Sequence, residues 1–417
     1  MERLIFHIDV NSAFLSWESV KRLKEGGDDL RLIPSIVGGD PQKRTGIVLA
    51  KSIPAKKYGV TTGEPVSMAL RKCPGLVIAK PDLRLYERCS KAFKAICREY
   101  APAMESASID EVFLDMTGTG RIYPDPIKTA YEIKDRIRDE LGFTVNVGIG
   151  RCKLCAKMAS DFQKPDKVHT LFPEEIEEKM WPLPCGELFL LGKSSAERLK
   201  NAGIYTIGDI AKMRLEDFQR LIGVKHGKML HDYANGIDDS PVKDVPDDAK
   251  GYSVETTLEE DLTDLENIDR MLLAQADVVG ARLRADDVKC RCIAVSYRTI
   301  SFQNKSHQRK LSKSTDVTSE IFETAKVLIR ESWQGQPLRL IGLAVSDVDH
   351  GEYEQFSFVT DTRREKLKKL DAAVDSIRGR YGNASVQIAG AMGRGGRVGR
   401  KYQAQHENKV EERNEDD

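Results

Sequence analysis

Three acidic residues next to short apolar runs are the residues of this chain best suited to chemistry. Asp110 and Glu111 lie between two apolar runs, and Asp9 ends another apolar run close to the N-terminus. Carboxylate oxygens are hard ligands that favour Mg2+ or Mn2+ over Zn2+. Two such ions about 3.5–4 Å apart stabilise the attacking and leaving oxygens of a phosphoryl transfer. The pattern therefore predicts a site for two divalent cations.

Asp110 and Glu111 can act together only if the chain reverses direction around them. In a regular strand, neighbouring side chains point to opposite faces of the sheet. We expect strands near 105–109 and 112–116 that form a hairpin with both acids at its tip. An Asp-Glu pair by itself is more often an exposed acidic turn, so the wider sequence pattern has to decide between the two interpretations.

Three longer motifs follow one another along the chain. An I-D-x-N-x-x-F motif, an S-I-D-E-x-F-L-D motif and a G-I-x-x-x-K-x-x-A-K-x-A-S-D-x-x-K-P motif occupy Ile8–Phe14, Ser108–Asp115 and Gly148–Pro165. The motifs and their order resemble those of the Y-family DNA polymerases, the translesion enzymes. The resemblance implies a template-directed, error-prone DNA polymerase, whose substrates are primer-template DNA and deoxynucleoside triphosphates.

The resemblance also implies roles for individual residues at its active site. It makes Asp9, Asp110 and Glu111 the catalytic metal ligands for two Mg2+ ions, with Mn2+ as an alternative and the carbonyl of Val10 as a further ligand. Phe14 stands at the steric gate, where a ring under the sugar leaves no room for a 2′-hydroxyl. By position alone, Phe14 would be assigned to the core of an amphipathic helix.

Residues of the triphosphate site match the family less closely. The resemblance implies nucleotide contacts from Asn11, Lys56 and Lys164, but Ile53 replaces the family's Tyr and Lys56 its Arg. Lysine offers a point charge where arginine offers a planar fork. We therefore expect Lys56 to be a weaker phosphate ligand and Ile53 to make no such contact.

The length and composition predict a protein of several domains without a membrane segment. A chain of 417 residues should form roughly two to four domains. No apolar run is long enough to span a membrane, and the N-terminus passes directly into a strand pattern without a signal peptide. We expect a cytoplasmic monomer, and we expect too little remaining length for a separate proofreading exonuclease.

The expected fold is a multidomain α+β arrangement, and the resemblance makes it a right-hand polymerase. It has a ferredoxin-like palm, small fingers, a helical thumb with a helix-hairpin-helix, and a β-α-β-β-α-β little finger. The expected boundaries are 1–22 and 78–168 for the palm, 23–77 for the fingers, 169–240 for the thumb, 241–250 for a linker, 251–350 for the little finger, 351–392 for a clamp-binding segment and C-terminal helix, and 393–417 for a disordered tail.

Capping residues and apolar spacing locate several of the expected helices. Asp125 should cap a helix that has Pro126 at its first position and ends at Gly142. Its buried stripe should comprise Ile127, Ala130, Ile133, Ile137 and Leu141. Thr263 and Glu266 should form a capping box for the first helix of the little finger. Residues 166–240 should be mostly helical.

Among the eight cysteines, Cys152 and Cys155 form one C-x-x-C, a spacing that occurs in metal and redox sites. A zinc ribbon requires a second pair at suitable spacing, and the sequence contains none. Leu154, Met158 and Phe162 recur four residues apart, which indicates a helix with a buried stripe. We therefore interpret both thiols as structural.

Two regions are predicted to bind DNA. The net charge of the chain is zero, with 65 Lys and Arg against 65 Asp and Glu, so this prediction rests on local rather than total charge. Residues 288–315 contain seven bases and no acid, so a basic sheet face should bind phosphates through Arg298, Lys305, Arg309 and Lys310. An ordinary solvated face is the alternative. Gly192 and Lys193 begin a segment that resembles a helix-hairpin-helix more than a P-loop, with Leu190 in place of its usual first Gly.

A short peptide near the C-terminus resembles the motif that bacterial proteins insert into the sliding clamp. It comprises Gln355, Phe356, Ser357, Phe358 and Val359, with Phe358 and Val359 as apolar anchors. A plain surface strand is the alternative.

Two other functions are possible for the whole chain: a nucleotidyl cyclase, which would need no DNA-binding domains, and a catalytically inactive scaffold, which would be expected to lack the three acids.

Overall fold

The computed structural model describes residues 2–42, 44, 46–349 and 362–391. The chain divides into two compact units: the first extends to Pro246, apart from 43–45, and the second begins at Asp247. Each unit is described by itself. None of the helices in the described ranges combines the length and the apolar character that crossing a membrane requires.

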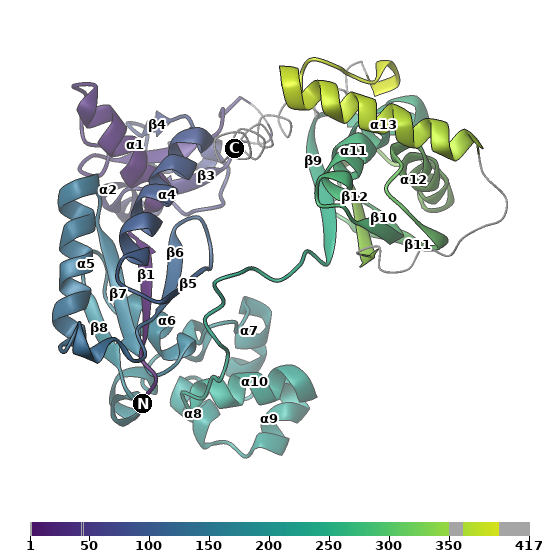
Figure 1. Ribbon diagram of the computed structural model, residues 1–417. Coiled ribbons are helices and arrows are strands. Elements are labelled where there is room, and N and C mark those ends of the chain that lie inside the picture. The colour runs from purple at the N-terminus through teal and green to yellow at the C-terminus, as the bar shows by residue number, and fades with distance from the viewer. Residues whose placement is uncertain (1, 43, 45, 350–361, 392–417) are drawn as a thin grey trace. The chain divides into compact units, whose positions relative to one another are not determined.

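A five-stranded sheet with β1 (Ile5–Val10) at its centre forms the core of the first unit. The strand order is β5-β6-β1-β7-β8, in which β1 runs antiparallel to both of its neighbours. Helices α4 and α5 cover one face and α6 covers the other (Figure 1). The other elements of this layer are β5 (Ala103–Ser106), β6 (Glu111–Asp115), β7 (Val145–Gly150), β8 (Val168–Leu171), α1 (Ala13–Lys24), α4 (Leu83–Arg98), α5 (Pro126–Leu141) and α6 (Lys153–Asp161).

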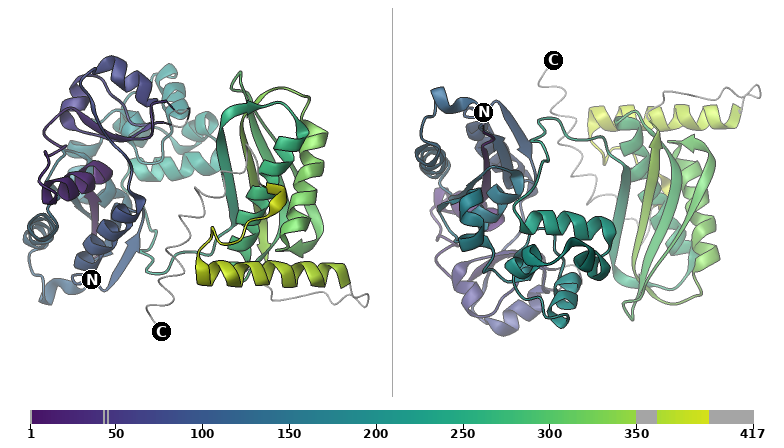
Figure 2. Two further views of the ribbon diagram at one scale, coloured as in Figure 1. Left: turned by 90° about the horizontal axis from the view of Figure 1, so that it is seen from above. Right: turned by 90° about the horizontal axis from the view of Figure 1, so that it is seen from below.

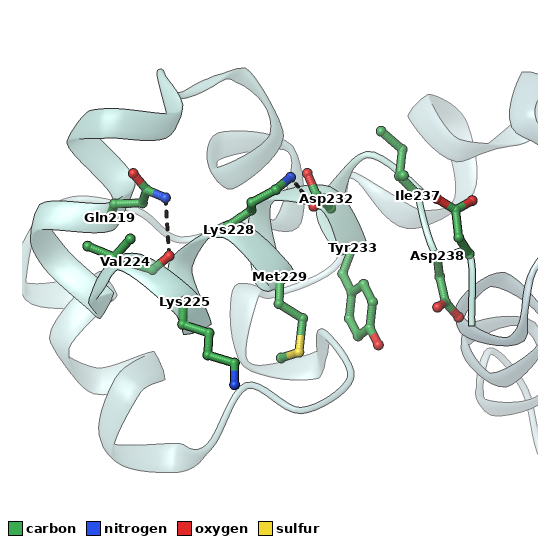
Figure 3. A pocket seen from close by; sticks show the side chains of 10 residues that line it. Gln219, Val224, Lys225, Lys228, Met229, Asp232, Tyr233, Ile237 and Asp238 are labelled. Atoms are coloured by element: carbon green, nitrogen blue, oxygen red, sulfur yellow. Dashed lines mark hydrogen bonds and ion pairs between the residues drawn. The ribbon is translucent and has the colours of Figure 1, made fainter. Parts of the chain in front are cut away.

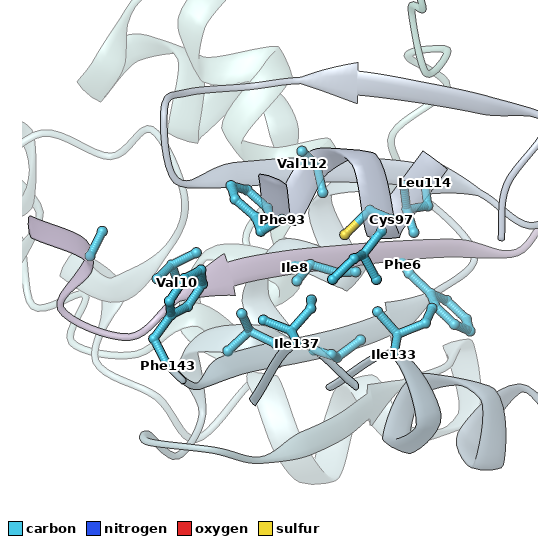
Figure 4. Close-up of a cluster of buried hydrophobic side chains, with 14 of the residues drawn as sticks. Phe6, Ile8, Val10, Phe93, Cys97, Val112, Leu114, Ile133, Ile137 and Phe143 are labelled. Carbon is cyan, nitrogen blue, oxygen red and sulfur yellow. The ribbon is translucent and has the colours of Figure 1, made fainter. Parts of the chain in front are cut away.

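Alternation along β1 separates the core from the chemistry. Phe6, Ile8 and Val10 are buried in an apolar cluster with side chains from α4 and α5 (Figure 4). Because successive side chains of a strand point to opposite faces, His7 and Asp9 point to the face that α6 covers. The strand thus uses one face for stability and presents its polar residues on the other.

Helix α6 crosses β7 at very short range, and glycine makes this possible. A Cβ atom on Gly148 would lie 1.9 Å from the carbonyl oxygen of Ala156, and one on Gly150 would lie 2.7 Å from Cβ of Cys155. Any larger residue at Gly148 would collide with helix backbone. The first turns of α6 are therefore fixed directly on the sheet.

A hairpin at the predicted place and the caps of α5 are confirmed, but the strands of the hairpin cover 103–106 and 111–115, so Glu111 begins β6 and only Asp110 lies in the turn. Two further details of the first unit were predicted wrongly. β5 and β6 pair antiparallel, and Asp125 accepts hydrogen bonds from the N–H groups of Ile127 and Lys128. Ile127, however, is 44% exposed, and the buried face of α5 begins at Thr129 and Ala130. Within 166–240, β8 is a strand that pairs parallel with β7, so the expected boundary after residue 168 cuts through this strand.

Two smaller layers complete the first unit. A three-stranded sheet of order β3-β2-β4 contains β2 (Ser35–Gly38), β3 (Val48–Lys51) and β4 (Val77–Ala79), with α2 (Ile53–Lys57) and α3 (Val66–Lys72) between its strands. A helical cluster contains α7 (Lys193–Asn201), α8 (Ile207–Lys212), α9 (Leu215–Ile222) and α10 (Val224–Ala234). Residues 237–250, which include the predicted linker, form neither helix nor strand.

The second unit has the predicted β-α-β-β-α-β order. Its sheet order is β11-β10-β12-β9, and α11 and α12 lie along one face (Figure 2). The predicted capping box was wrong, because Asp264 rather than Thr263 caps α11 by accepting from the N–H of Asn267. The elements are β9 (Gly251–Leu262), α11 (Leu265–Ala285), β10 (Lys289–Thr299), β11 (Asn304–Thr315), α12 (Thr318–Ser332) and β12 (Leu338–Asp349).

A further helix, α13 (Thr362–Tyr381), is attached to the second unit by ion pairs. The guanidinium of Arg378 donates to both carboxylate oxygens of Asp277 at 2.9 and 2.8 Å, and both residues are buried. Arg284 of α11 pairs with Asp371 and Asp375 of α13. The predicted clamp peptide, 355–359, and the predicted disordered tail, 393–417, lie outside the described residues.

Candidate active site

Two of the three predicted acids lie directly opposite each other on neighbouring strands. Asp9 of β1 is the register partner of Glu111 of β6, so their side chains share the face of the sheet that α6 covers. Asp110 occupies the turn before β6, where its carbonyl oxygen accepts a hydrogen bond from the N–H of Val10 at 3.0 Å. The fold therefore places Asp9, near the end of β1, beside Asp110 and Glu111, which come about a hundred positions later in the sequence.

Each of these three acids already has a hydrogen-bonding partner. The ammonium of Lys164 lies on the carboxylate of Asp9, and that of Lys157 lies 2.5 Å from Oε1 of Glu111. The carboxylate of Asp110 accepts the hydroxyl proton of Ser108 at 2.6 Å. Across the described ranges of the chain, no three His, Cys, Asp or Glu side chains converge as a metal cage.

The chemistry of these donors nevertheless fits a divalent cation. The three side chains offer only hard carboxylate oxygens, which are the donors that Mg2+ and Mn2+ prefer. A lysine ammonium contacts the carboxylate of Asp9 and another contacts that of Glu111. Positive charge therefore already lies where a metal ion would supply it. Residues that would hold the ion are Asp9, Asp110, Glu111 and the backbone of Val10.

The two facing carboxylates differ in their electrostatic surroundings. Burial raises the pKa of Asp9 above its ordinary value, although the Lys164 ammonium opposes that effect. His7 and the Lys157 ammonium hold the pKa of Glu111 at about 2, against the cost of partial burial. Glu111 is therefore ionised under all ordinary conditions, whereas burial makes the charged form of Asp9 less favourable than that of Glu111.

Three residues near Glu111 were not predicted from the sequence. His7 and Lys157 face its carboxylate, and Ser160 is hydrogen-bonded to His7. His7 is fully buried, with Nε2 3.8 Å from Oε2 of Glu111 and Nδ1 in a 2.8 Å hydrogen bond with Oγ of Ser160. Burial lowers the pKa of His7, so the ring is neutral near pH 7. The period of two along β1 could have assigned His7 to the same side as Asp9, but only tertiary packing places α6 over both.

Asn11 holds the loop that carries Lys164. Its side-chain oxygen accepts from the N–H of Asp166 at 2.9 Å and from the hydroxyl of Thr144 at 3.0 Å, and its amide donates to Asn146. The buried amide is thus engaged in fixing the loop. Lys164 itself lies between Asp9 and Asp161, whose Oδ1 is 2.8 Å away.

Phe14 is the second residue of α1, which follows β1 closely in the chain. Its ring stacks on Tyr86 with centroids 4.6 Å apart and an angle of 15° between the ring planes. Tyr86 is fully buried and donates its hydroxyl proton to Glu18 at 2.8 Å. Phe14 is only partly buried, so a fixed ring presents part of its surface to solvent.

The predicted nucleic-acid residues of the helical cluster lie at the start of α7. Gly192 is the N-cap, and Lys193 is the first and exposed residue of the helix. Leu190 adopts a φ of 65°, the left-handed conformation that usually requires glycine. The hairpin thus keeps the backbone turn that its missing glycine would have provided.

The four basic residues predicted to line one sheet face are divided between two faces. Arg298 pairs in register with Asn304, and Lys310 with Cys292, on the face that no helix covers. Lys305 and Arg309 are register partners of the buried Tyr297 and Ile293 and therefore share the helix side. Arg309 is also paired with Glu331 of α12 at 2.6 Å.

Comparison with known proteins identifies the family. The impB/mucB/samB family model matches residues 8–161, and its C-terminal domain model matches 249–358. The IMS family HHH motif matches 173–204, and the DNA polymerase-iota thumb domain matches 190–238. These matches span most of the five-stranded sheet, the helical cluster, and the sheet of the second unit with α11 and α12.

Relatives of similar length carry one description. DNA polymerase IV of Clostridium acetobutylicum is 45% identical over 92% of this chain and 96% of that protein, and DNA polymerase IV of Acetivibrio thermocellus is 38% identical over 93% and 97%. A solved Y-family DNA polymerase chimera of Dbh and Dpo4 has a TM-score of 0.72 at 22% identity, covering 83% of this chain and 99% of that chain. The chain belongs to the Y family of DNA polymerases and is a DNA-directed DNA polymerase.

Proposed function

We propose that translesion DNA synthesis takes place at the strand ends that carry Asp9, Asp110 and Glu111. The observation that supports this assignment is the register pair of Asp9 and Glu111, with Asp110 joined to Val10 through the backbone. Enzymes of this family use divalent metal ions, and we assign two Mg2+ to these carboxylates. Bound there, the ions would acidify the primer 3′-hydroxyl and neutralise charge on the leaving pyrophosphate.

The protein's own side chains orient the reactants around that site. Lys164 lies close enough to Asp9 to contact the triphosphate, and Asn11 fixes the loop that carries it. Lys56 is exposed on α2 and is a second candidate for the phosphates. Lys157 and His7 keep Glu111 ionised and oriented, so the carboxylate needs little reorganisation during the reaction.

Primer extension with purified protein, Mg2+ and the four deoxynucleoside triphosphates tests the assignment. Template-directed extension that requires a divalent ion is expected, and it should continue past a damaged template base. An inactive scaffold would bind the duplex and extend nothing. A nucleotidyl cyclase would convert a nucleoside triphosphate without any template. Nothing in the fold or the comparisons favours either of those alternatives.

The open face of the second unit's sheet is proposed to track duplex phosphates through Arg298 and Lys310. Replacing either residue with Ala should weaken DNA affinity for every sequence and lower the log–log salt slope by about one. Arg309→Ala is the matched control, because Arg309 points to the helix side and pairs with Glu331. Fluorescence anisotropy over a range of salt concentrations measures the slopes. If Arg309→Ala alone changed the slope, the DNA would lie on another surface.

Gly192 and Lys193 are proposed to offer a second phosphate contact. The first N–H groups of α7 have no partner within the helix, and such groups bind anions readily. A Cβ on Gly192 would meet no atom within 4 Å, so the backbone there is open to a ligand. Together the two contact regions would hold the duplex without reading its sequence.

Residues Gln355, Phe356, Phe358 and Val359 are proposed to bind the sliding clamp. A tether to a ring on DNA raises the effective concentration of a loosely held polymerase. Replacing Gln355, Phe358 and Val359 with Ala should leave clamp-free extension unchanged and abolish stimulation by a loaded clamp. Extension assays with and without clamp measure this effect. Full stimulation of the triple variant would reject the assignment.

A further inference from the structure

The two cysteines of the C-x-x-C lie at the start of α6, where a pair of thiols can react with each other. Cys152 is the N-cap residue, and its Sγ accepts a hydrogen bond from the N–H of Cys155 at 3.4 Å. Cys155 occupies the third helical position, so both thiols lie at the positive end of the helix dipole. The pKa of a cysteine thiol is commonly lowered at a helix N-terminus and within a C-x-x-C motif.

Both thiols also contact one carbonyl on the segment that follows α10. The S–H groups of Cys152 and Cys155 donate to the carbonyl oxygen of Gly236 at 3.5 and 3.7 Å. Two residues later, Asp238 accepts the N–H of Leu154 at 3.0 Å. This joint, formed by Cys152, Leu154, Cys155, Gly236 and Asp238, connects α6 to the start of the linker.

The joint leaves little free space for its parts to shift. A Cβ on Gly236 would lie 2.2 Å from Cδ1 of Ile176 and 3.5 Å from Sγ of Cys155. On its other side, α6 is pressed against β7 at Gly150. Cys152 and Cys155 belong to the apolar cluster that includes Ala234 of α10. Both sulfurs are therefore held close together by the surrounding packing.

Their surroundings give the two thiols different reactivity. The hydrogen bonds with Cys155 lower the pKa of Cys152, and the same contact together with burial raises the pKa of Cys155. Both cysteines are buried, with 5% of the surface of Cys152 exposed against 2% for Cys155. In known dithiol sites, the acidic and more exposed cysteine attacks first.

A groove of about 420 Å3 opens beside the joint (Figure 3). Tyr233, Ile237 and Asp238 form part of its lining, and Asp238 is the residue that accepts from Leu154. Burial, together with the charges of Asp238 and Cys152, raises the pKa of the Tyr233 phenol. Neither cysteine lines the groove, so a disulfide reagent reaches Cys152 when the joint opens locally.

We propose that Cys152 and Cys155 form a reversible disulfide whose formation loosens the attachment of Gly236 to α6. The thiolate of Cys152 attacks a low-molecular-weight disulfide, forming a mixed disulfide and releasing one thiolate. Cys155 then loses its proton and attacks Sγ of Cys152, forming the internal S–S bond and releasing the second thiolate. The protein loses two electrons and two protons, and the reagent becomes two thiols.

The physical consequence follows from the hydrogen bonds. A disulfide has no S–H group, so the carbonyl of Gly236 loses both of its donors at once. The segment after α10 would then be attached to α6 by a weaker joint. A transient, regulatory disulfide is the kind that reducing compartments permit. The assignment replaces the structural interpretation of these thiols that the sequence suggested.

The test incubates the full-length protein in buffers of increasing oxidised-to-reduced glutathione ratio. Free thiols are then alkylated, and the peptides are identified by mass spectrometry. A Cys152–Cys155 disulfide should form and should reverse on reduction. Hydrogen exchange at residues 236–240 should be about tenfold faster in the oxidised wild-type protein, as expected for the loss of two weak hydrogen bonds.

Single variants establish the order of attack. Cys155→Ser should trap glutathione on Cys152, whereas Cys152→Ser should trap none on Cys155. Cys185→Ser is the matched control, because Cys185 is a buried thiol that donates to the carbonyl of Ile204 at 3.5 Å and lies in the same helical cluster; it should behave like the wild type. Complete alkylation of both thiols at the highest ratio, or a disulfide without faster exchange at 236–240, would overturn the proposal.

Discussion

Removing the charge of either hairpin acid should reduce the rate of nucleotide addition by at least about a thousandfold, because a divalent ion cannot be held without it. Asp110→Asn and Glu111→Gln keep the shape of the side chains and remove only the negative charge. Single-turnover primer extension measures the rate. DNA affinity should be nearly unchanged, because the proposed duplex contacts lie on α7 and in the second unit.

Asp115→Asn is the matched control for these acids. Asp115 lies on the same strand and the same face as Glu111, four residues further along, where it accepts the N–H of Thr117 at 2.9 Å. It has no part in the proposed metal site, so its variant should extend primers at the wild-type rate. Near-normal rates for both Asp110→Asn and Glu111→Gln would show that the chemistry takes place elsewhere.

The second large effect is expected at Phe14. Phe14→Ala should raise the incorporation of ribonucleotides by about a hundredfold, because it opens space for a 2′-hydroxyl. The stack on Tyr86 fixes the ring, so the wild-type side chain cannot turn aside to admit the extra oxygen. The ratio of kcat/KM for a deoxynucleotide to that for the matching ribonucleotide measures discrimination.

Phe14→Tyr is the control, since it keeps the ring and should keep the discrimination. A purely structural role for Phe14 makes a different prediction: Phe14→Ala would lower the midpoint of denaturant unfolding and leave the sugar preference unchanged. Measuring both quantities on both variants therefore distinguishes the gate from the core interpretation.

Local sequence signals were sufficient for much of this fold. Asp125, Pro126 and Gly142 predicted both ends of α5, because caps act through neighbouring backbone groups. The acidic hairpin was predictable for the same reason, since both of its strands adjoin the turn. Where two adjacent residues could cap a helix, as at Thr263 and Asp264, the sequence could not decide which backbone geometry would form.

The parts that sequence reasoning missed depend on which elements pack together. Lys157 lies on Glu111 only because α6 crosses β1 and β7, and His7 lies near Glu111 because β1 pairs with β6. No local pattern contains either arrangement. The division of Arg298 and Arg309 between two sheet faces likewise depends on strand register and on the position of α12. Charge composition showed that a basic segment exists, but not the direction in which each base points.

The central position of β1 has a consequence for synthesis of the chain on the ribosome. Both of its partner strands are made much later, since β6 begins at Glu111 and β7 at Val145. At about 5–20 residues per second, the apolar β1 waits on the order of ten seconds or more before it can pair. An unpaired apolar strand is prone to aggregation, so the nascent chain should need shielding by a chaperone until residue 150 has emerged.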